Sequence, residues 1–444
     1  MITNKTSSFV PVLCGGLGGC EGLRTTDFGR GTGDTGRGTV GRALRARRGG
    51  FGETALPGCR LAAFAVALAL TLAFCAPGVL AQVQRTVIPD IPGYKTLLCD
   101  FHIHTSFSDG VVWPTVRVDE AEREGLSSIA LTEHLESRRF IQSKSVTRNG
   151  AHDAATQAAK DKNIILIRGG EITRALPPGH VNAIFLTDCD PLYQKEWTDS
   201  VAEAKKQNAF ITWNHPDWDP QLPHTTSWFP EHEELLKKGC LHGIEVANGT
   251  LYSPKAFQWA LDKKLTMLGC SDAHPPLSSD IEYAKGEHRT MTLVFARERT
   301  AAGIREALDN RRTAVYFREF LFGEEQWLRP VLEQSLVVHK MEYPEVTSKY
   351  RPRIAITFKN NSSMTFRLRK IVPGENPVYY RERIVKPYGF LVLNVATPED
   401  TGADEVSFEV ANFLTTPEKP LVWTIKLPRE VPGEKPKSKT PDAD

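Results

Sequence analysis

The stretch that decides the fold is LLCDFHIH at residues 97–104, a short apolar run that ends in two histidines spaced two residues apart. Side chains two apart on a β-strand point to the same face, so His102 and His104 are expected to lie side by side. Apolar runs of the same kind recur downstream. They are SSIALTEH (127–134), NIILIRGGE (163–171), HVNAIFL (180–186), AFITWNH (209–215), GIEVANG (243–249), LTMLGCSDAH (265–274) and TMTLVFA (290–296).

Helical stretches separate these runs. They are predicted at Pro114–Glu124, Ala151–Asp161, Glu196–Gln207, Glu231–Lys238, Pro254–Lys263 and Arg299–Asn310. Alternation of strands and helices predicts parallel βαβ units, hence an open α/β sheet or a barrel. No glycine-rich dinucleotide- or phosphate-binding fingerprint follows the first strand, which weakens the open-sheet alternative. About seven units in roughly 220 residues fit a TIM-like barrel.

The pattern changes after Pro330, where short alternating runs are separated by turn-forming residues such as those at 360–363. Several short strands with frequent turns are typical of an all-β sandwich. The last residues are rich in Pro, Lys and Asp, a composition typical of disorder. The predicted organisation is an α/β barrel over 82–325, a β-sandwich over 330–430 and a disordered tail over 431–444.

Residues 1–81 are interpreted as an N-terminal extension that ends in a secretory signal peptide. The apolar run 61–75 follows basic residues and precedes small residues, and cleavage is expected near Ala81. The protein is therefore expected to be periplasmic or secreted. The run is too short for a comfortable membrane span, so no stable span is expected after cleavage; an uncleaved membrane anchor is the alternative.

The cysteines that remain after such cleavage are Cys99, Cys189, Cys240 and Cys270. They show no C-x-x-C spacing, which argues against a zinc–thiolate site. Cys99 and Cys270 lie in apolar runs, so we predict that they are buried as small hydrophobic side chains.

The charge balance is nearly even, with 55 Lys and Arg against 53 Asp and Glu, a formal charge of +2. Such a balance gives no electrostatic reason to expect a nucleic-acid partner. With 41% hydrophobic and 24% charged residues, the composition is that of a globular chain rather than a fibrous or disordered one. The sequence leaves the oligomeric state open.

Polar residues gather at the ends of the predicted strands, where barrel enzymes place their chemistry. The candidate metal ligands are His102, His104, Asp109, His134, Glu171, His180, His215, Asp272 and His274. Imidazoles and carboxylates without thiolates suit zinc, iron(II) or manganese(II). The set is too large for one ion, so two or three divalent ions are expected, with Glu171 bridging. Taken alone, Ser108-Asp109-Gly110 and Asn214-His215-Pro216 could each be a turn.

In residue type and order, these motifs resemble the PHP (polymerase and histidinol phosphatase) family over roughly residues 96–317. The resemblance implies a distorted (β/α)7 barrel, a two- or three-metal site and phosphoesterase activity. It implies that His102, His104, Glu171 and Asp272 hold one metal, that Glu171, His180 and His215 hold a second, and that Asp109, His134 and His274 hold a third. Asp109 stands where some members of the family have His, which makes the third set the least secure.

The expected activity is hydrolysis of a small-molecule phosphomonoester, or phosphodiester, by a metal-activated hydroxide. Asp272 or His274 would protonate the leaving group, directly or through a water. Guanidinium groups match phosphate geometry, and the candidates for substrate binding are Arg174, Arg289 and Arg138. Each of these arginines could equally be a solvated surface residue.

Two other functions compete with this hypothesis. One is a metal-dependent amidohydrolase-like barrel that acts on a C–N bond, although no suitable bridging lysine lies on a middle strand. The other is a non-catalytic binding protein whose barrel has lost its activity. The complete set of candidate ligands argues against the second, because a decayed site usually loses ligands.

Overall fold

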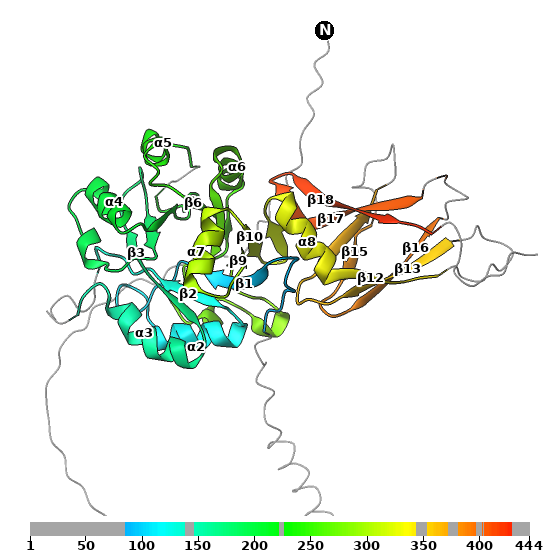
Figure 1. The fold of residues 1–444 in the computed structure, drawn as a ribbon, viewed down its shortest axis with the longest axis horizontal. Helices are drawn as coiled ribbons and strands as arrows, with labels where there is room; N and C mark the ends of the chain where they lie inside the picture. Colours follow the sequence, from blue (N-terminus) through cyan, green and yellow to red (C-terminus); the bar gives the residue numbers. More distant parts are fainter. Residues whose placement is uncertain are drawn as a thin grey trace, which may run out of the picture. The chain divides into compact units, whose positions relative to one another are not determined.

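The computed structural model describes residues 85–137, 146–221, 226–342, 353–371, 381–396, 402 and 404–428 (Figure 1). The predicted signal peptide within residues 1–81, the candidate Arg138 and the predicted tail at 431–444 lie outside the described residues. Across the described part, no helix has the length and apolar character needed to cross a membrane.

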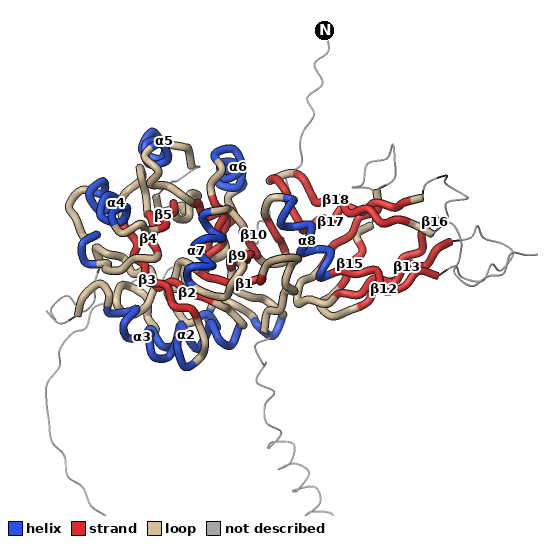
Figure 2. The backbone as a smooth tube through the Cα atoms, in the orientation of Figure 1, coloured by secondary structure: helices blue, strands red, loops and turns tan. Residues whose placement is uncertain are grey.

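The first part of the chain alternates strands and helices, with the helices at the periphery and the strands inside (Figure 2). Its strands are β1 (Lys95–Asp100), β2 (Ser128–Leu131), β3 (Ile165–Ile172), β4 (Val181–Ile184), β5 (Phe210–Trp213), β6 (Gly243–Asn248), β7 (Leu251–Tyr252), β8 (Thr266–Cys270), β9 (Met291–Ala296), β10 (Thr313–Phe317) and β11 (Phe320–Phe322). Its helices are α2 (Pro114–Glu124), α3 (Gly150–Asp161), α4 (Trp197–Lys206), α5 (Pro230–Lys237), α6 (Pro254–Lys263) and α7 (Ala301–Asp309). Short 3-10 turns lie at Asp190–Leu192, Leu277–Ser279 and Tyr283–Lys285.

The predicted helices are confirmed, and local chemistry explains where several of them begin. Proline is the first residue of α2, α5 and α6. Proline suits this position because its fixed φ is helical and its missing N–H would have no partner there. At the start of α6, the Ser253 hydroxyl also accepts a hydrogen bond from the Ala256 N–H at 3.1 Å.

The predicted parallel βαβ units are present, but they make up only part of a mixed sheet. Strand β2 pairs in parallel with β1 and β3, and β6 does so with β5 and β8. Strand β4, however, is antiparallel to both β3 and β5, and β9 is antiparallel to both β1 and β10. Parallel pairing needs a long crossover, usually a helix. The β3–β4 segment, residues 173–180, is too short for one and contains none.

Strand β8 is linked to β9 by side-chain hydrogen bonds, and to the segment after β1 by pairing beyond the strand ends. Within the described residues the backbone ladder is open between β8 and β9, where Thr292 Oγ1 donates to Gly269 O at 2.8 Å and accepts from Gly269 N at 3.0 Å. Beyond the ends of β1 and β8, Ile103 forms a parallel bridge with Ala273. The predicted class, a distorted α/β barrel, is therefore confirmed with a mixed sheet.

The interior of this part is apolar and includes the cysteines. Cys99 and Cys270 belong to a buried cluster that also contains Phe101 and Phe210. All four cysteines of the described residues are buried free thiols. The prediction that Cys99 and Cys270 act as small hydrophobic side chains is confirmed.

The second part is a β-sandwich, as predicted. Its strands are β12 (Leu336–Glu342), β13 (Arg353–Asn360), β14 (Phe366–Lys370), β15 (Arg383–Val385), β16 (Phe390–Ala396), β17 (Glu405–Thr416) and β18 (Lys419–Lys426). Strands β12, β13 and β16 form one sheet, and β14, β15, β17 and β18 belong to the other. Alternate residues of β13 are buried, and Phe358 meets Phe408 and Trp423 of the facing sheet with ring centroids 5.9 and 5.5 Å apart.

The two parts share a core, and the predicted boundary between residues 325 and 330 lies within a helix. Helix α8 (Glu325–Ser335) runs across it, with Pro330 inside the helix. Strand β11 pairs in parallel with β17, which joins the sheet of the first part to the sandwich. Leu328 and Leu332 of α8 lie in one apolar cluster with Leu293 of the first part and Phe358 of the second. Continuous apolar packing, not a linker, connects them.

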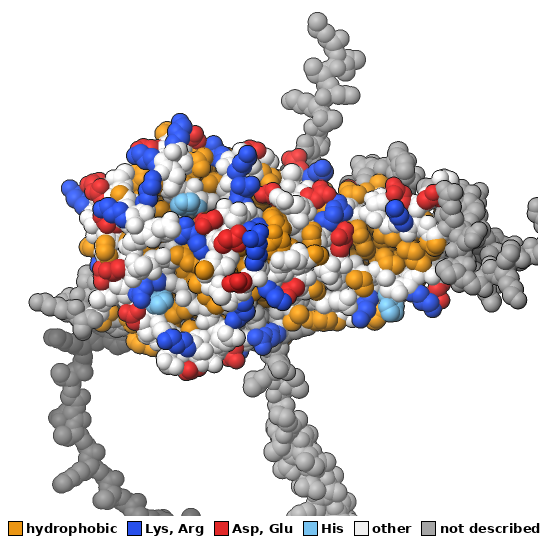
Figure 3. Space-filling model, in the orientation of Figure 1, with side chains coloured by type: hydrophobic (Ala, Val, Ile, Leu, Met, Phe, Trp, Pro, Cys, Tyr) orange, Lys and Arg blue, Asp and Glu red, His pale blue; other side chains and the backbone are white. Residues whose placement is uncertain are grey.

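The face of the molecule in Figure 3 shows basic and acidic side chains interspersed over the first part, while hydrophobic side chains gather over the sandwich. Interspersed charges agree with the near-zero net charge. Large exposed hydrophobic side chains of the sandwich include Ile384, Tyr388, Phe390 and Val392.

The shared core predicts that the first part depends on the sandwich for stability. Removing residues 330–444 should lower Tm by roughly 10 °C or more, or abolish soluble expression, because it exposes the β11 edge and the α8 contact surface. Thermal melting with size-exclusion chromatography measures this. Removing only residues 429–444 is the matched control and should leave Tm unchanged. A monomeric truncated protein with the Tm of the full chain would contradict the prediction.

Candidate metal centre

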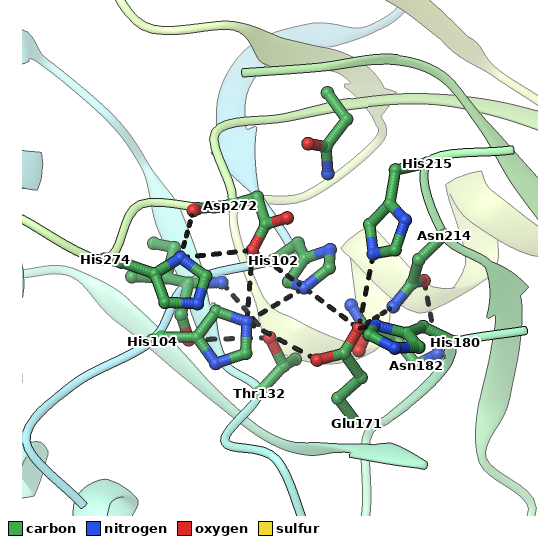
Figure 4. A network of polar contacts seen from close by, with 12 residues as sticks. His102, His104, Thr132, Glu171, His180, Asn182, Asn214, His215, Asp272 and His274 are labelled. Carbon is green, nitrogen blue, oxygen red and sulfur yellow. Dashed lines mark hydrogen bonds and ion pairs between the residues drawn. The ribbon is translucent and has the colours of Figure 1, made fainter. Parts of the chain in front are cut away.

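The fold brings the predicted ligands together at one edge of the sheet (Figure 4). His102 and His104 follow β1, His134 follows β2, Glu171 lies in β3 and His215 follows β5. Asp272 and His274 come after β8. His180 precedes β4, and because β4 is antiparallel to β3 and β5, its start lies beside their ends. A histidine at the beginning of a strand therefore joins residues at the ends of others.

Four of these side chains converge on one point. The Nε2 atoms of His102 and His104 are 3.0 Å apart, and Asp272 Oδ1 lies 3.2 and 3.1 Å from them. Each of the same nitrogens lies 3.5 Å from a carboxylate oxygen of Glu171. Ligand atoms about 2.0–2.1 Å from one tetrahedral ion are roughly 3.3 Å from one another. The spacing of these atoms fits a shared cation.

A second group of converging side chains surrounds the carboxylate of Asp109. Its Oδ1 is 3.2 Å from His274 Nε2, and its Oδ2 is 3.3 Å from His134 Nε2. The His104 ring stacks against each of the two imidazoles, with ring centroids 4.4 Å from His134 and 4.2 Å from His274. The turn residue of Ser108-Asp109-Gly110 thus faces the histidines.

The set formed by Glu171, His180 and His215 is less compact. Glu171 Oε1 lies 3.1 Å from His180 Nδ1 and 3.6 Å from His215 Nε2. By distance, His180 groups with His134 and Glu171, whereas His215 groups with His102 and Asp272. The two histidines therefore lie near Glu171 but in different groups of converging atoms.

Several buried atoms of the cluster make no hydrogen bond, among them Glu171 Oε2, Asp272 Oδ1 and His215 Nδ1. Glu171 Oε2 is 2.6 Å from His134 Nδ1, but this approach lacks hydrogen-bond geometry. A buried carboxylate oxygen without a partner costs free energy. A divalent cation would satisfy these lone pairs, so the residues present fit a metal.

The charges of the cluster also favour cations. Burial alone would raise the pKa of Glu171, but the imidazoles of His102 and His134 hold it well below its usual range. The pKa of Asp272 is likewise lowered, against burial, by the histidines around it. Burial would lower the pKa of His134, yet Glu171 and Asp109 raise it to about 10. The carboxylates are ionised at neutral pH and hold positive charge beside them.

A buried carboxylate behind the ligands was not predicted. Glu245 Oε1 lies 2.8 Å from His102 Nδ1, and its Oε2 accepts the backbone N–H of His215 at 2.8 Å. A carboxylate on Nδ1 leaves Nε2 of His102 as the free nitrogen that faces the cluster. The signal was present in the sequence, because Glu245 is an acidic residue inside the apolar run GIEVANG.

The candidate substrate-binding arginines have different environments. Arg289 is fully buried, with Nη1 3.1 Å from Asp100 Oδ2 and Nη2 2.8 Å from Glu124 Oε1. Carboxylates occupy both sides of its guanidinium, so its role in substrate binding stays a prediction that these contacts do not favour. Arg174 is 19% exposed, ion-paired with Glu136 and bonded to Gln194 O at 2.8 Å, and its role stays a prediction.

Comparison with known proteins agrees with this geometry. A two-domain protein from Bacteroides vulgatus that contains a predicted PHP-like metal-dependent phosphoesterase is 49% identical, with a TM-score of 0.71; the match covers 78% of this chain and 98% of that one. A family model described as an Ig-like domain matches residues 338–426. No curated protein matches the chain.

Two further solved structures match about half of the chain. A predicted metal-dependent phosphoesterase from Bifidobacterium adolescentis is 17% identical with a TM-score of 0.34, covering 49% of this chain and 97% of that one. An amidohydrolase from Chromobacterium violaceum, with bound sulfate and no metal, is 16% identical with a TM-score of 0.33, covering 49% and 97%. These two likenesses are too low to bear on function.

The fold and the converging ligands define a two-domain α/β-barrel protein with a candidate metal centre. The 49% identity with the Bacteroides vulgatus protein, over 98% of that protein's length, shows which family this chain belongs to. The chain belongs to the PHP family.

Gly110 offers a test of how Asp109 is placed. A Cβ at this position would lie 2.8 Å from the His104 carbonyl carbon and from the backbone N and O of Thr105. Gly110→Ala should therefore shift the turn and the His104 backbone, and weaken binding of the ion nearest Asp109 about tenfold or more. Gly239→Ala, whose Cβ would meet nothing within 4 Å but whose φ of 61° adds local strain, controls for backbone effects elsewhere. Unchanged metal binding in Gly110→Ala, measured by titration against a chelator, would contradict this.

Proposed function

We propose that the protein is a metal-dependent phosphoesterase that hydrolyses a small-molecule phosphomonoester outside the cytoplasm, with a phosphodiester as the alternative substrate. The observation that carries the proposal is the convergence of imidazole nitrogens and ionised carboxylates on shared points at the edge of the sheet. Membership in the PHP family supports it.

The residues proposed to hold two or three divalent ions (zinc, manganese or iron) are those of the cluster. His102, His104, Glu171 and Asp272 would hold the first, Glu171, His180 and His215 the second, and Asp109, His134 and His274 the third. Bound there, divalent ions would neutralise charge on the phosphoryl oxygens and make a bound water more acidic.

The charge of the site favours a phosphomonoester. Counted as formal charges, Asp109, Glu171, Asp272 and the adjacent Glu245 bring four negative charges, whereas three divalent ions would bring six positive ones, which leaves a surplus of two. A phosphomonoester is largely a dianion at neutral pH, whereas a diester carries a single charge. The surplus therefore stabilises the monoester more strongly, and a two-ion site would reduce this preference.

The proposed proton donors are Asp272 and His274. His274 Nδ1 lies 2.8 Å from the Asp272 carbonyl oxygen and donates to it, so the ring presents Nε2 to Asp109. With Nε2 turned toward Asp109, His274 is oriented to act as a metal ligand. This role would compete with direct proton donation from the same nitrogen. We therefore assign protonation of the leaving oxygen to a water held by Asp272 or His274, whose side chain is 34% exposed. Arg174 is the remaining described candidate for a contact with the phosphoryl group.

The decisive variant is Glu171→Gln, which keeps the shape of the side chain and removes its charge. Because both carboxylate oxygens face histidines of the cluster, the bound ions should decrease and kcat should fall at least about 1,000-fold. Metal analysis and turnover of phosphomonoester, phosphodiester and amide panels measure this. Glu203→Gln, at a half-buried position of α4 where Glu203 pairs with Lys206, should behave as the wild type. Full activity of Glu171→Gln, or turnover of amides alone by the wild type, would overturn the proposal.

A further inference from the structure

A buried arginine lies directly behind the ligand-bearing segments. Arg117 of α2 is 0% exposed, and its guanidinium has five N–H groups. All five have acceptors in the structure. Nε donates to His104 O at 2.9 Å, Nη1 to Glu120 Oε2 at 2.8 Å and Pro275 O at 2.9 Å, and Nη2 to Ala273 O at 2.8 Å and His274 O at 2.9 Å.

The four carbonyl acceptors belong to two chain segments that are far apart in sequence, whereas Glu120 lies on α2 itself. One follows β1 and carries His104, and the other follows β8 and carries Asp272 and His274. The segments contact each other through three backbone bonds, from Asp272 N to His102 O at 2.8 Å, from His104 N to Ala273 O at 3.1 Å and from Val111 N to His274 O at 3.0 Å. Arg117 therefore bridges the two segments through its hydrogen bonds to both.

The segment after β8 needs such support because its backbone is strained. Asp272 has a φ of 51°, in the left-handed region that non-glycine residues seldom adopt. Strain of this kind persists only where surrounding contacts fix the conformation. Asp100 holds one side through the N–H of Ser271 at 3.1 Å and its hydroxyl at 2.6 Å, and Arg117 holds the other side through three carbonyls.

We propose that Arg117 is a positioning residue for the metal centre: its guanidinium fixes the backbone of His104, Ala273 and His274 so that the side chains of His104, Asp272 and His274 converge. Only Glu120 balances its charge, since the other acceptors are neutral carbonyls. A buried charge is an expensive way to gain stability alone, which favours a role in specifying geometry. The inference rests on the proposed function in that the converging side chains bind metal.

A lysine cannot replace this arrangement. It would keep the positive charge, but its ammonium has three donors at a single point and cannot reach Glu120 together with four carbonyls on two segments. Arg117→Lys is therefore the sharpest variant. The matched control is Arg312→Lys, because Arg312 is also buried, donates to Phe295 O at 3.0 Å and pairs with Glu306, away from the ligand-bearing segments.

The experiment measures zinc and manganese binding to metal-stripped full-length protein by titration against a chelator, together with Tm. Arg117→Lys should weaken at least one ion tenfold or more and lower kcat with little change in KM. Arg312→Lys should keep the metal affinity of the wild type even if its Tm falls as far. N-ethylguanidinium should restore part of the metal affinity of Arg117→Ala, whereas ethylammonium should not.

Two results would overturn the inference. One is wild-type metal affinity in Arg117→Lys; the other is an equal loss of affinity in both lysine variants, which would indicate a general effect of destabilisation. Metal binding by the wild type without any turnover would overturn the proposed phosphoesterase function but leave the inference standing. A wild type that binds neither ion would overturn both.

Discussion

The structure depends on the burial of one carboxylate among imidazoles. Glu171 lies within strand β3 with a fully buried side chain, and histidines from β1, β2, β4 and β5 surround its two oxygens. An ionised carboxylate taken out of water needs positive charge beside it, or its pKa rises until it is neutral. Its pKa instead is held low by its neighbours. Bound cations would therefore supply positive charge beside the buried carboxylate at this edge of the sheet.

The remainder of the fold can be understood as support for this edge. The reversed direction of β4 brings His180 to the ends of β3 and β5, and the strained backbone at Asp272 turns its carboxylate toward His102 and His104. Buried polar groups behind the ligands hold these positions, as Glu245 does for His102. Such supporting contacts determine ligand orientation and hence metal affinity.

Sequence patterns predicted most of the local structure and the candidate ligands. Helices α2 and α6 have the predicted bounds, because a proline at the first position and a regular apolar spacing are local signals. The candidate ligands stand out in the sequence because they are polar residues next to apolar runs. The direction of β4 could not be predicted, since periodicity reports which face is buried and carries no information about the pairing partner.

Tertiary contacts account for the remaining differences between the predictions and the structure. Arg289 was expected to meet substrate because a guanidinium group matches phosphate geometry, and only the fold reveals its pairing with Glu124 and Asp100. The predicted boundary at Pro330 lies inside α8, because this helix tolerates the proline and packs against both parts of the chain. Such tertiary pairings are set by residues distant in sequence, which a local pattern does not report.

Anomalous X-ray scattering from crystals of the metal-loaded protein tests the central claim most directly. Data collected at the absorption edge of the bound metal should show two or three peaks, with two of them on either side of the Glu171 carboxylate. Absence of any peak within coordination distance of Glu171 would contradict the account.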